Sequence, residues 1–227
     1  MESDAVKLTM DSQEESGFTF VLEDKLSGEE KKLSLGLQYW SSWVTPDNWN
    51  NGQNSGVYNF RPESGEYEPK EYTEIQGAFK SGNKQWDFYF QQPDRIELNN
   101  QRKVIVHVYL TDLGTVKYEV DYDSIPMTEL DGYEVIAKFQ VSDFFNNQTF
   151  YTDSNGMEMQ ERKLNYRPTW DFVNTNLADS NENITGNYFP VQSALSMLDT
   201  KSDMIFTVMN DRSQGASALS EGTIEFM

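Results

Sequence analysis

The sequence predicts an all-β protein, a large antiparallel β-sandwich, and three observations lead to that prediction. Apolar and polar residues alternate in several runs, as expected for strands that bury one face. Runs with the helical spacing of apolar residues are scarce. Asn-Gly and Asp-Gly pairs, which favour the tight turns of antiparallel hairpins, interrupt the chain. Consecutive strands of this kind pack as two sheets around a shared core.

The alternation predicts strands at 85–90, 104–110, 115–120, 133–141, 204–209 and 222–227. Aliphatic residues of the second run share one face, namely Val104, Val106, Val108 and Leu110. In the fourth run, Val135, Ala137 and Phe139 share one face and Ile136 takes the other. The prolines fall near the ends of such runs or in loops, where they do not break the hydrogen bonds of a ladder.

One domain is predicted for most of the chain. Residues 17–227 contain no linker strong enough to divide them, and they are assigned to the sandwich. Residues 1–16 are predicted to form an arm or an incomplete strand. Two polar, Asn-rich segments, 41–56 and 171–187, are predicted to be loops.

The charge of the chain excludes several classes of partner. Its 227 residues include 18 Lys and Arg against 37 Asp and Glu, a net charge of −19. Nucleic acids and anionic membrane surfaces bind clustered cations, so neither is predicted as a partner. No run approaches the roughly 18 apolar residues of a membrane span. The first ten residues show no basic segment followed by an apolar one, so no signal peptide is predicted.

The chemistry available to the chain is limited by two residue types. It has no cysteine and one histidine, His107, which excludes disulfides, thiol catalysis and a metal site with several histidines. His107 lies within a predicted strand, and we interpret it as structural. Paired carboxylates carry out glycoside hydrolysis, but no pair stands out among 37 acidic residues. No catalytic residue and no metal ligand are therefore assigned.

Two further motifs concern turns and modification. The segment 153–156, Asp-Ser-Asn-Gly, lacks the spacing of a calcium loop and is interpreted as a hairpin turn. Asn147 and Asn183 each begin an Asn-X-Thr sequence, so both are candidates for N-glycosylation if the protein is secreted.

Five blocks of sequence resemble a known enzyme family. They are SGVYNFRP at 55–62, GYEVI at 132–136, FYTDSNGMEMQERKLNYRPTW at 150–170, GNYFPV at 186–191 and DRSQGASALSEGTIEFM at 211–227. In this order and spacing they resemble the C-terminal β region of class II α-mannosidases, glycoside hydrolase family 38, and the lysosomal-type branch in particular. The resemblance covers roughly residues 33–227.

The resemblance implies a fold and a reaction. The family region forms a β-sandwich of the galactose-mutarotase, glycosidase C-terminal type, and it continues beyond the segment that ends here, so a sandwich truncated at its C-terminus is expected. Family members hydrolyse terminal α-mannose with retention, using an Asp nucleophile and a zinc ion held by two His and two Asp. These groups lie upstream in the family, so no cofactor is expected in this chain, zinc is expected in the catalytic domain, and the chain alone is expected to be inactive.

The resemblance also implies two contacts with sugar at the rim of the cleft. Tyr58 follows from the SGxY segment and Arg162 from the stretch after the FYTDxNG hairpin. A tyrosine hydroxyl donates to and accepts from sugar hydroxyls, and an arginine fork spans adjacent oxygens. Two alternatives stay open: Tyr58 as a core tyrosine, and Arg162 in a surface ion pair with Glu158 or Glu161.

Three functional hypotheses follow. In the first, the chain is the C-terminal β part of a retaining, zinc-dependent α-mannosidase, whose partners are an α-mannoside glycan and the upstream catalytic domain. In the second, it is a stand-alone carbohydrate-binding or structural β-sandwich without catalysis. In the third, its acidic surface binds a basic partner. The resemblance implies a lysosomal, vacuolar or secreted location.

Overall fold

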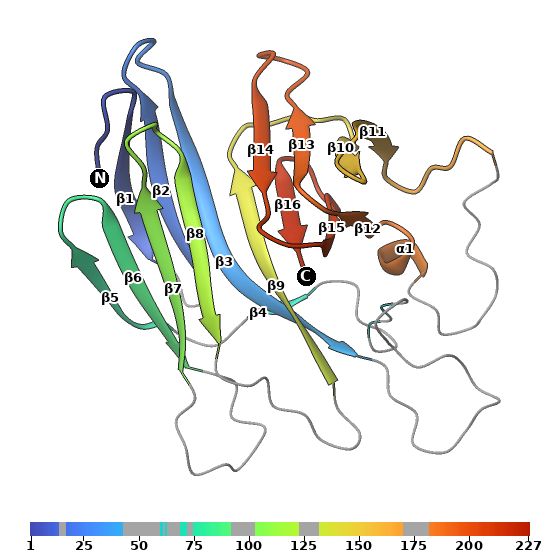
Figure 1. Cartoon of the computed structure of the whole chain (residues 1–227), viewed down its shortest axis with the longest axis horizontal. Coiled ribbons are helices and arrows are strands. Elements are labelled where there is room, and N and C mark those ends of the chain that lie inside the picture. The colour runs from blue at the N-terminus through green and yellow to red at the C-terminus, as the bar shows by residue number, and fades with distance from the viewer. Residues whose placement is uncertain are drawn as a thin grey trace. The chain divides into compact units, whose positions relative to one another are not determined.

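The computed structural model shows a chain that is nearly all β, and it describes residues 1–13, 17–42, 60, 62, 69–71, 75–91, 103–122, 132–169 and 182–227. The predicted all-β, antiparallel fold is confirmed (Figure 1). The strands of the described residues are β1 (Val6–Gln13), β2 (Gly17–Asp24), β3 (Glu30–Ser42), β4 (Lys70–Glu71), β5 (Ile75–Ser81), β6 (Gln85–Gln91), β7 (Lys103–Leu110), β8 (Val116–Tyr122), β9 (Gly132–Val141), β10 (Thr149–Ser154), β11 (Glu158–Lys163), β12 (Phe189–Val191), β13 (Ala194–Leu198), β14 (Ile205–Met209), β15 (Gln214–Ser217) and β16 (Thr223–Phe226). A short helix, α1, spans Glu182–Thr185.

Two compact units make up the chain. The first comprises residues 1–38 and 71–126, and the second comprises residues 39–70 and 127–227. The long strand β3 begins in the first unit and ends in the second. Residues 6–13, within the predicted arm or incomplete strand, form β1, which pairs antiparallel with β2. The predicted boundary between residues 16 and 17 stays a prediction.

The first unit packs two antiparallel sheets face to face. One contains β1, β2 and the first part of β3, and the other has the order β5-β6-β7-β8. Phe18 of β2 stacks on Phe88 of β6 with ring centroids 3.7 Å apart, and Phe20 meets the same ring edge-on. Such aromatic pairs contribute about 0.5–1.5 kcal/mol beyond the burial of their area. The predicted buried face of β7 is confirmed, because Val104, Val106, Val108 and Leu110 are all buried.

The second unit also contains two sheets. The end of β3 is followed by β9, β16, β15 and β12 in one, and the other has the order β11-β10-β13-β14. Phe150 of β10 meets Phe189 of β12 edge-on at 5.7 Å, which joins the two sheets. A further buried cluster contains Trp40, Ile136 and Ile184, so part of α1 packs against the strands.

Strand β9 departs from the predicted one-sided pattern. Phe139 is buried as expected, but Ile136, which was placed on the opposite face, is fully buried too. Val135 and Ala137 are only half-buried. The reason is that β9 lies in the interior of its sheet and packs on both faces, with Ile136 against Trp40 and Ile184. A strand covered on both sides does not obey a simple alternation.

The predicted hairpin at Asn155-Gly156 is confirmed. It joins β10 to β11, and both residues have positive φ angles, 55° and 67°. This conformation is the one that type I′ turns require. The predicted turn at Asn51-Gly52 lies outside the described residues, as does Asp131 of the other predicted turn.

Candidate functional site

The β10–β11 hairpin carries the one predicted sugar-contacting residue that the structure describes, Arg162. Arg162 lies on β11 opposite Phe150 of β10 in the antiparallel register. Its Nε donates a hydrogen bond to the Thr152 Oγ1 at 3.0 Å. Because this bond links neighbouring strands of one hairpin, it fixes the direction in which the guanidinium leaves the sheet.

An aromatic ring supports the guanidinium from the other sheet. The Arg162 Cζ lies 4.5 Å from the centroid of the Phe189 ring, and the Arg167 Cζ lies 4.8 Å from the same centroid. Arg167 also donates to the carbonyl oxygens of Tyr166, at 2.8 Å, and of Gly186. Two cations therefore share one ring, which is a favourable contact for each of them.

Arg162 and Arg167 bring two positive charges together in a chain whose net charge is −19. Burial lowers the pKa of Arg162, and burial together with the charge of Arg162 lowers the pKa of Arg167. Both guanidinium groups remain charged at physiological pH. No carboxylate of the described residues lies within ion-pair distance of Arg162, so neither Glu158 nor Glu161 forms the ion pair that was kept as an alternative.

The remaining donors of Arg162 determine what it can do. Its Nε is engaged by Thr152, whereas the terminal nitrogens have no hydrogen-bond acceptor among the described residues. The side chain is half-buried, so these nitrogens belong to a group that solvent still reaches. A planar fork held at one end and open at the other suits two adjacent oxygens of a ligand.

The other predicted site residues are placed as follows. Tyr58 lies outside the described residues, so the structure does not bring it together with Arg162. Asn147 is exposed in the turn before β10, and its backbone has a φ angle of 50°. Asn183 lies in α1. The assignments of these residues to sugar contact or glycosylation stay predictions.

Asp153 anchors the hairpin that presents Arg162. Its carboxylate accepts backbone hydrogen bonds from Gly156, in the turn, and from Gln192, Ser193 and Ala194, which precede or begin β13. Burial alone would raise the pKa of Asp153, but these four backbone donors lower it to about 2. The hairpin is thereby tied to the chain segment that follows Phe189 and β12.

A buried acidic group in the same unit was missed by the sequence analysis. Glu225 of β16 is 3% exposed, and its Oε1 has no hydrogen-bond partner among the described residues. Burial raises its pKa to about 7, although a hydrogen bond with Tyr188 and the charge of Lys138 lower it in part. The Tyr188 hydroxyl also accepts a hydrogen bond from the Trp40 Nε1 at 3.2 Å. The only signal in the sequence was a glutamate inside an apolar strand pattern.

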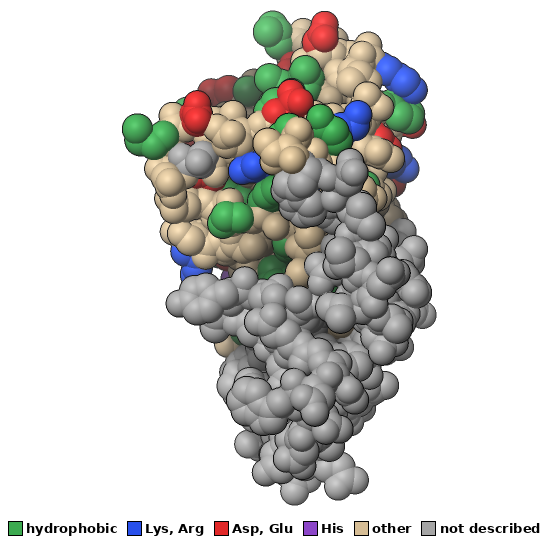
Figure 2. All heavy atoms as spheres, turned by 90° about the vertical axis from the view of Figure 1, so that its right-hand side faces the viewer, with side chains coloured by type: hydrophobic (Ala, Val, Ile, Leu, Met, Phe, Trp, Pro, Cys, Tyr) green, Lys and Arg blue, Asp and Glu red, His purple; other side chains and the backbone are tan. Residues whose placement is uncertain are grey.

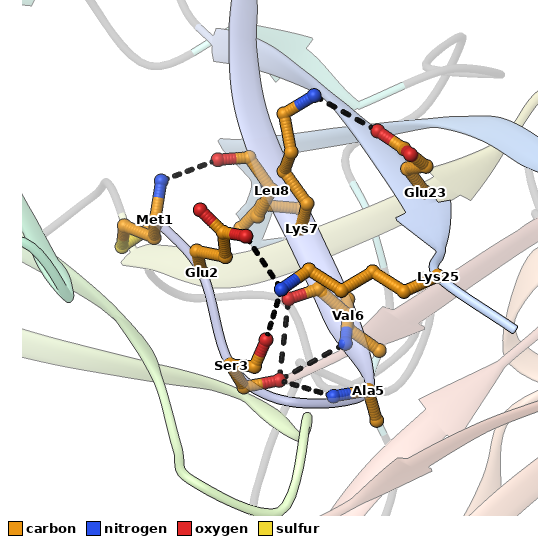
Figure 3. Close-up of polar contacts among 9 residues, drawn as sticks. All are labelled: Met1, Glu2, Ser3, Ala5, Val6, Lys7, Leu8, Glu23 and Lys25. Carbon is orange, nitrogen blue, oxygen red and sulfur yellow. Dashed lines mark hydrogen bonds and ion pairs between the residues drawn. The ribbon is translucent and has the colours of Figure 1, made fainter. Parts of the chain in front are cut away.

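The first unit contains a pocket of about 660 Å³ with many lysines. Its lining includes Lys7, Lys25, Lys80 and Lys84. The Lys7 Nζ lies 2.9 Å from the Glu23 Oε2, and the Lys25 ammonium pairs with Glu2 and donates to the carbonyl oxygen of Ser3. Figure 3 shows these contacts. Lys84 pairs with Asp112, so three of these four lysines have a carboxylate partner. The pocket therefore has mixed charge and does not indicate an anion site.

Charge is similarly mixed elsewhere. Figure 2 shows acidic and basic side chains interspersed over the described part of one face. Within the described ranges, no cluster of three or more His, Asp or Glu residues is suited to hold a metal ion. No helix of the described residues is long and apolar enough to cross a membrane.

The hairpin motif around Arg162 and the antiparallel sheets agree with a family assignment from sequence comparison. The model of the glycosyl hydrolases family 38 C-terminal domain matches residues 48–227. This chain therefore belongs to glycoside hydrolase family 38 and represents its C-terminal domain region, as the sequence resemblance predicted.

Several curated relatives of this chain are α-mannosidases. Lysosomal α-mannosidase from Bos taurus is 44% identical over 103 residues, which cover 45% of this chain and 9% of that protein. Lysosomal α-mannosidase from Dictyostelium discoideum is 27% identical over 233 residues, covering 100% of this chain and 21% of that protein. A probable α-mannosidase from Arabidopsis thaliana is 31% identical over 177 residues, 77% of this chain and 15% of its own length. The chain thus spans a small part of these relatives.

Proposed function

We propose that this chain is the C-terminal β part of a retaining, zinc-dependent α-mannosidase that removes terminal α-mannose from glycans. In this proposal it supplies sugar contacts at the rim of the cleft through Tyr58 and Arg162. The nucleophile and the zinc ligands come from an upstream catalytic domain, which is the partner of this chain. The family match and the names of the relatives support the class of enzyme.

The observation that carries the proposed sugar contact is the geometry of Arg162. Its guanidinium is fixed by Thr152 and rests on Phe189, while its terminal nitrogens have no acceptor among the described residues. Hydrogen bonds from a charged donor contribute about 1.5–3 kcal/mol. A mannose unit offers adjacent hydroxyls at the spacing that such a fork can span.

Zinc does not fit the described residues of this chain. They contain no suitable cluster of three ligands, and the whole sequence has one histidine and no cysteine. We therefore propose that the upstream domain holds the metal and carries out the bond-breaking chemistry. The expected contribution of the chain is binding and orientation of the sugar, which lowers the entropic part of the barrier.

The first test is activity of the isolated chain. An aryl α-mannoside should not be hydrolysed by the purified chain, with or without added zinc. Turnover that increases in proportion to chain concentration would refute the assignment of the catalytic groups to another domain.

The second test is affinity, and it separates this function from that of a stand-alone carbohydrate-binding module. In the enzyme that contains both this chain and the catalytic domain, we expect Arg162→Ala to weaken mannoside binding by roughly tenfold or more. Tyr58→Phe should weaken mannoside binding less. Arg212→Ala is the matched control, because Arg212 is exposed and pairs with its neighbour Asp211. Tight binding by the isolated chain would favour the stand-alone module, and an unchanged affinity in Arg162→Ala would refute the proposed contact.

We further propose a lysosomal or vacuolar location, since relatives are named lysosomal α-mannosidases. Glycosylation at Asn147 and Asn183 is part of this proposal, because proteins delivered to the lysosome or vacuole through the secretory pathway are exposed to the enzymes that glycosylate asparagine. The exposed side chain of Asn147 supports it. Immunolocalisation of the full protein outside these compartments would contradict it.

A further inference from the structure

The single histidine of the chain lies at the centre of an acidic cluster in the first unit. His107 is on β7, an interior strand of the β5–β8 sheet, on the face opposite the buried valines. In the antiparallel registers, Asp87 of β6 and Glu119 of β8 flank it directly. The imidazole side chain is 20% exposed.

Both ring nitrogens of His107 face carboxylates. Nδ1 lies 2.6 Å from the Asp87 Oδ1, and Nε2 lies 3.5 Å from the Asp121 Oδ2. The Asp87 side chain is 14% exposed, and its Oδ1 also accepts a hydrogen bond from the Gln85 Nε2 at 2.6 Å. Asp87 is therefore a fixed acceptor in the middle of the sheet, whereas Asp121 is mostly exposed to solvent.

This arrangement fits one protonation state of the imidazole. A neutral imidazole has one N–H and one lone pair, so it can donate to only one of two carboxylates. Its other nitrogen would then direct a lone pair toward a negative oxygen. An imidazolium donates from both nitrogens and satisfies Asp87 and Asp121 together.

The charged groups around the ring favour the same state. Among the described residues they are the carboxylates of Asp87, Glu119 and Asp121, the ammonium of Lys117, which pairs with Glu119, and the hydroxyl of Tyr109, which interacts with Glu119. Carboxylates thus outnumber cations on this patch when the imidazole is neutral. Like charges on neighbouring strands destabilise a sheet, and a central cation relieves their repulsion.

We propose that protonated His107 is an ionic clamp that holds β6, β7 and β8 together, and that its deprotonation weakens the first unit as pH rises. The first unit is therefore more stable at acidic pH, where His107 is protonated, than at basic pH. It needs no ligand and is independent of the sugar contact proposed for Arg162.

The pKa of His107 agrees in direction with this geometry. Partial burial lowers the pKa, but the hydrogen bonds and charges of Asp87 and Asp121 together outweigh it and raise the pKa above the ordinary 6.5. A folded-state pKa above the unfolded value means that the folded state binds the proton more tightly. The stabilisation is complete below about pH 6.5 and disappears as the pH rises through the folded-state value.

The presence of one histidine makes the proposal directly testable by NMR. The chain, free of any affinity tag, should give a single imidazole resonance set, whose titration reports His107 alone. We expect its midpoint to lie higher in the folded chain than in the same chain unfolded by urea. Asp87→Asn should shift the midpoint down strongly and Asp121→Asn should shift it down less. Asp143→Asn, an equal change of charge at an exposed turn residue of the second unit, should leave it unchanged.

Stability completes the test. Urea unfolding of the chain and of His107→Gln is compared from about pH 5 to about pH 9, and the difference isolates His107 from other groups that titrate in this range, such as Glu225. The unfolding free energy of the wild type should exceed that of His107→Gln by less and less as the pH rises above the unfolded-state pKa of the histidine. Equal midpoints in the folded and unfolded chain, or equal shifts in Asp87→Asn and Asp143→Asn, would overturn the proposal. These NMR outcomes decide it even if His107→Gln fails to fold.

Discussion

Replacement of Asp153 by Asn should destabilise the second unit by an amount that depends on pH. The Asp153 side chain is 4% exposed, and its Oδ1 accepts backbone hydrogen bonds from Gln192, Ser193 and Ala194 at 2.8, 3.0 and 3.3 Å. Its Oδ2 accepts another from Gly156 at 3.0 Å. An Asn side chain keeps one oxygen but places an amide donor where a second acceptor is needed. At least one of these four backbone N–H groups then faces another donor.

The magnitude follows from the pKa of the carboxyl group. Burial raises this pKa and the backbone donors lower it, with a net result of about 2 against an ordinary value of 3.8. The difference between these two pKa values, at about 1.4 kcal/mol per pKa unit, corresponds to roughly 2–3 kcal/mol of stabilisation by the ionised form. The folded-state pKa is the lower one, so this stabilisation is present above about pH 3.8 and is lost as the pH falls through about 2. We expect Asp153→Asn to cost about 2–3 kcal/mol near neutral pH.

The assay is urea unfolding of the chain and of Asp153→Asn at several pH values from about 7 down to about 2. The difference in unfolding free energy between the two should shrink toward the acid end, because the Asp153 carboxylate becomes increasingly protonated as the pH approaches its folded-state pKa of about 2. Asp203→Asn is the control, since Asp203 is an exposed turn residue with a φ angle of 56° that Asn tolerates. A loss below about 0.5 kcal/mol in Asp153→Asn, or a loss that does not change with pH, would refute the reasoning.

Three further predictions concern other positions. Burial raises the pKa of Glu225 to about 7, so the folded state binds this proton more tightly than the unfolded state does. The unfolding free energy should therefore fall by up to about 3 kcal/mol as the pH rises from about 4.5 to about 7. Glu225→Gln should remove this pH dependence in urea unfolding, and an unchanged dependence would contradict its assignment to Glu225. Phe88→Ala should cost about 3–5 kcal/mol in urea unfolding, because the ring is fully buried and stacked, whereas Phe79→Ala, at a ring that is 63% exposed, should cost less than about 1 kcal/mol. Expression in glycosylating cells should give a gel shift that Asn147→Gln reduces and that the double change with Asn183→Gln removes. Mass spectrometry that finds the Asn147 peptide unmodified would contradict glycosylation at that residue.

Alternation predicted the strands well where a sheet has one buried face. Strand β7 is the clearest case, since its valines are buried and His107 lies on the other side. The one-sided burial predicted for strand β9 was wrong, because both of its faces are packed. Residues far away in the sequence, such as Trp40, cover the second face. The helix α1 was not predicted, because four residues give no helical period.

The candidate site shows the same limit. Arg162 was identified from a family motif, and no property of its local sequence singled it out. Its supports, Thr152 and Phe189, lie 10 and 27 positions away, and strand register and sheet packing bring them to it. Glu225 was missed for a related reason, because whether a glutamate on a strand is solvated or enclosed depends on what packs against that face. Such properties belong to the tertiary structure.

The ring beneath Arg162 has a thermodynamic consequence. A free arginine side chain carries about 2 kcal/mol of rotamer entropy, which it must lose when it orders around a ligand. Contact with Phe189 and the bond to Thr152 restrict Arg162 during folding of the chain itself. The ordering cost is therefore met before any ligand arrives, and a molecule that reaches this guanidinium meets a preorganised donor. Removing the Phe189 ring should accordingly make the entropy of ligand binding less favourable, while the Arg162 guanidinium itself remains chemically unchanged.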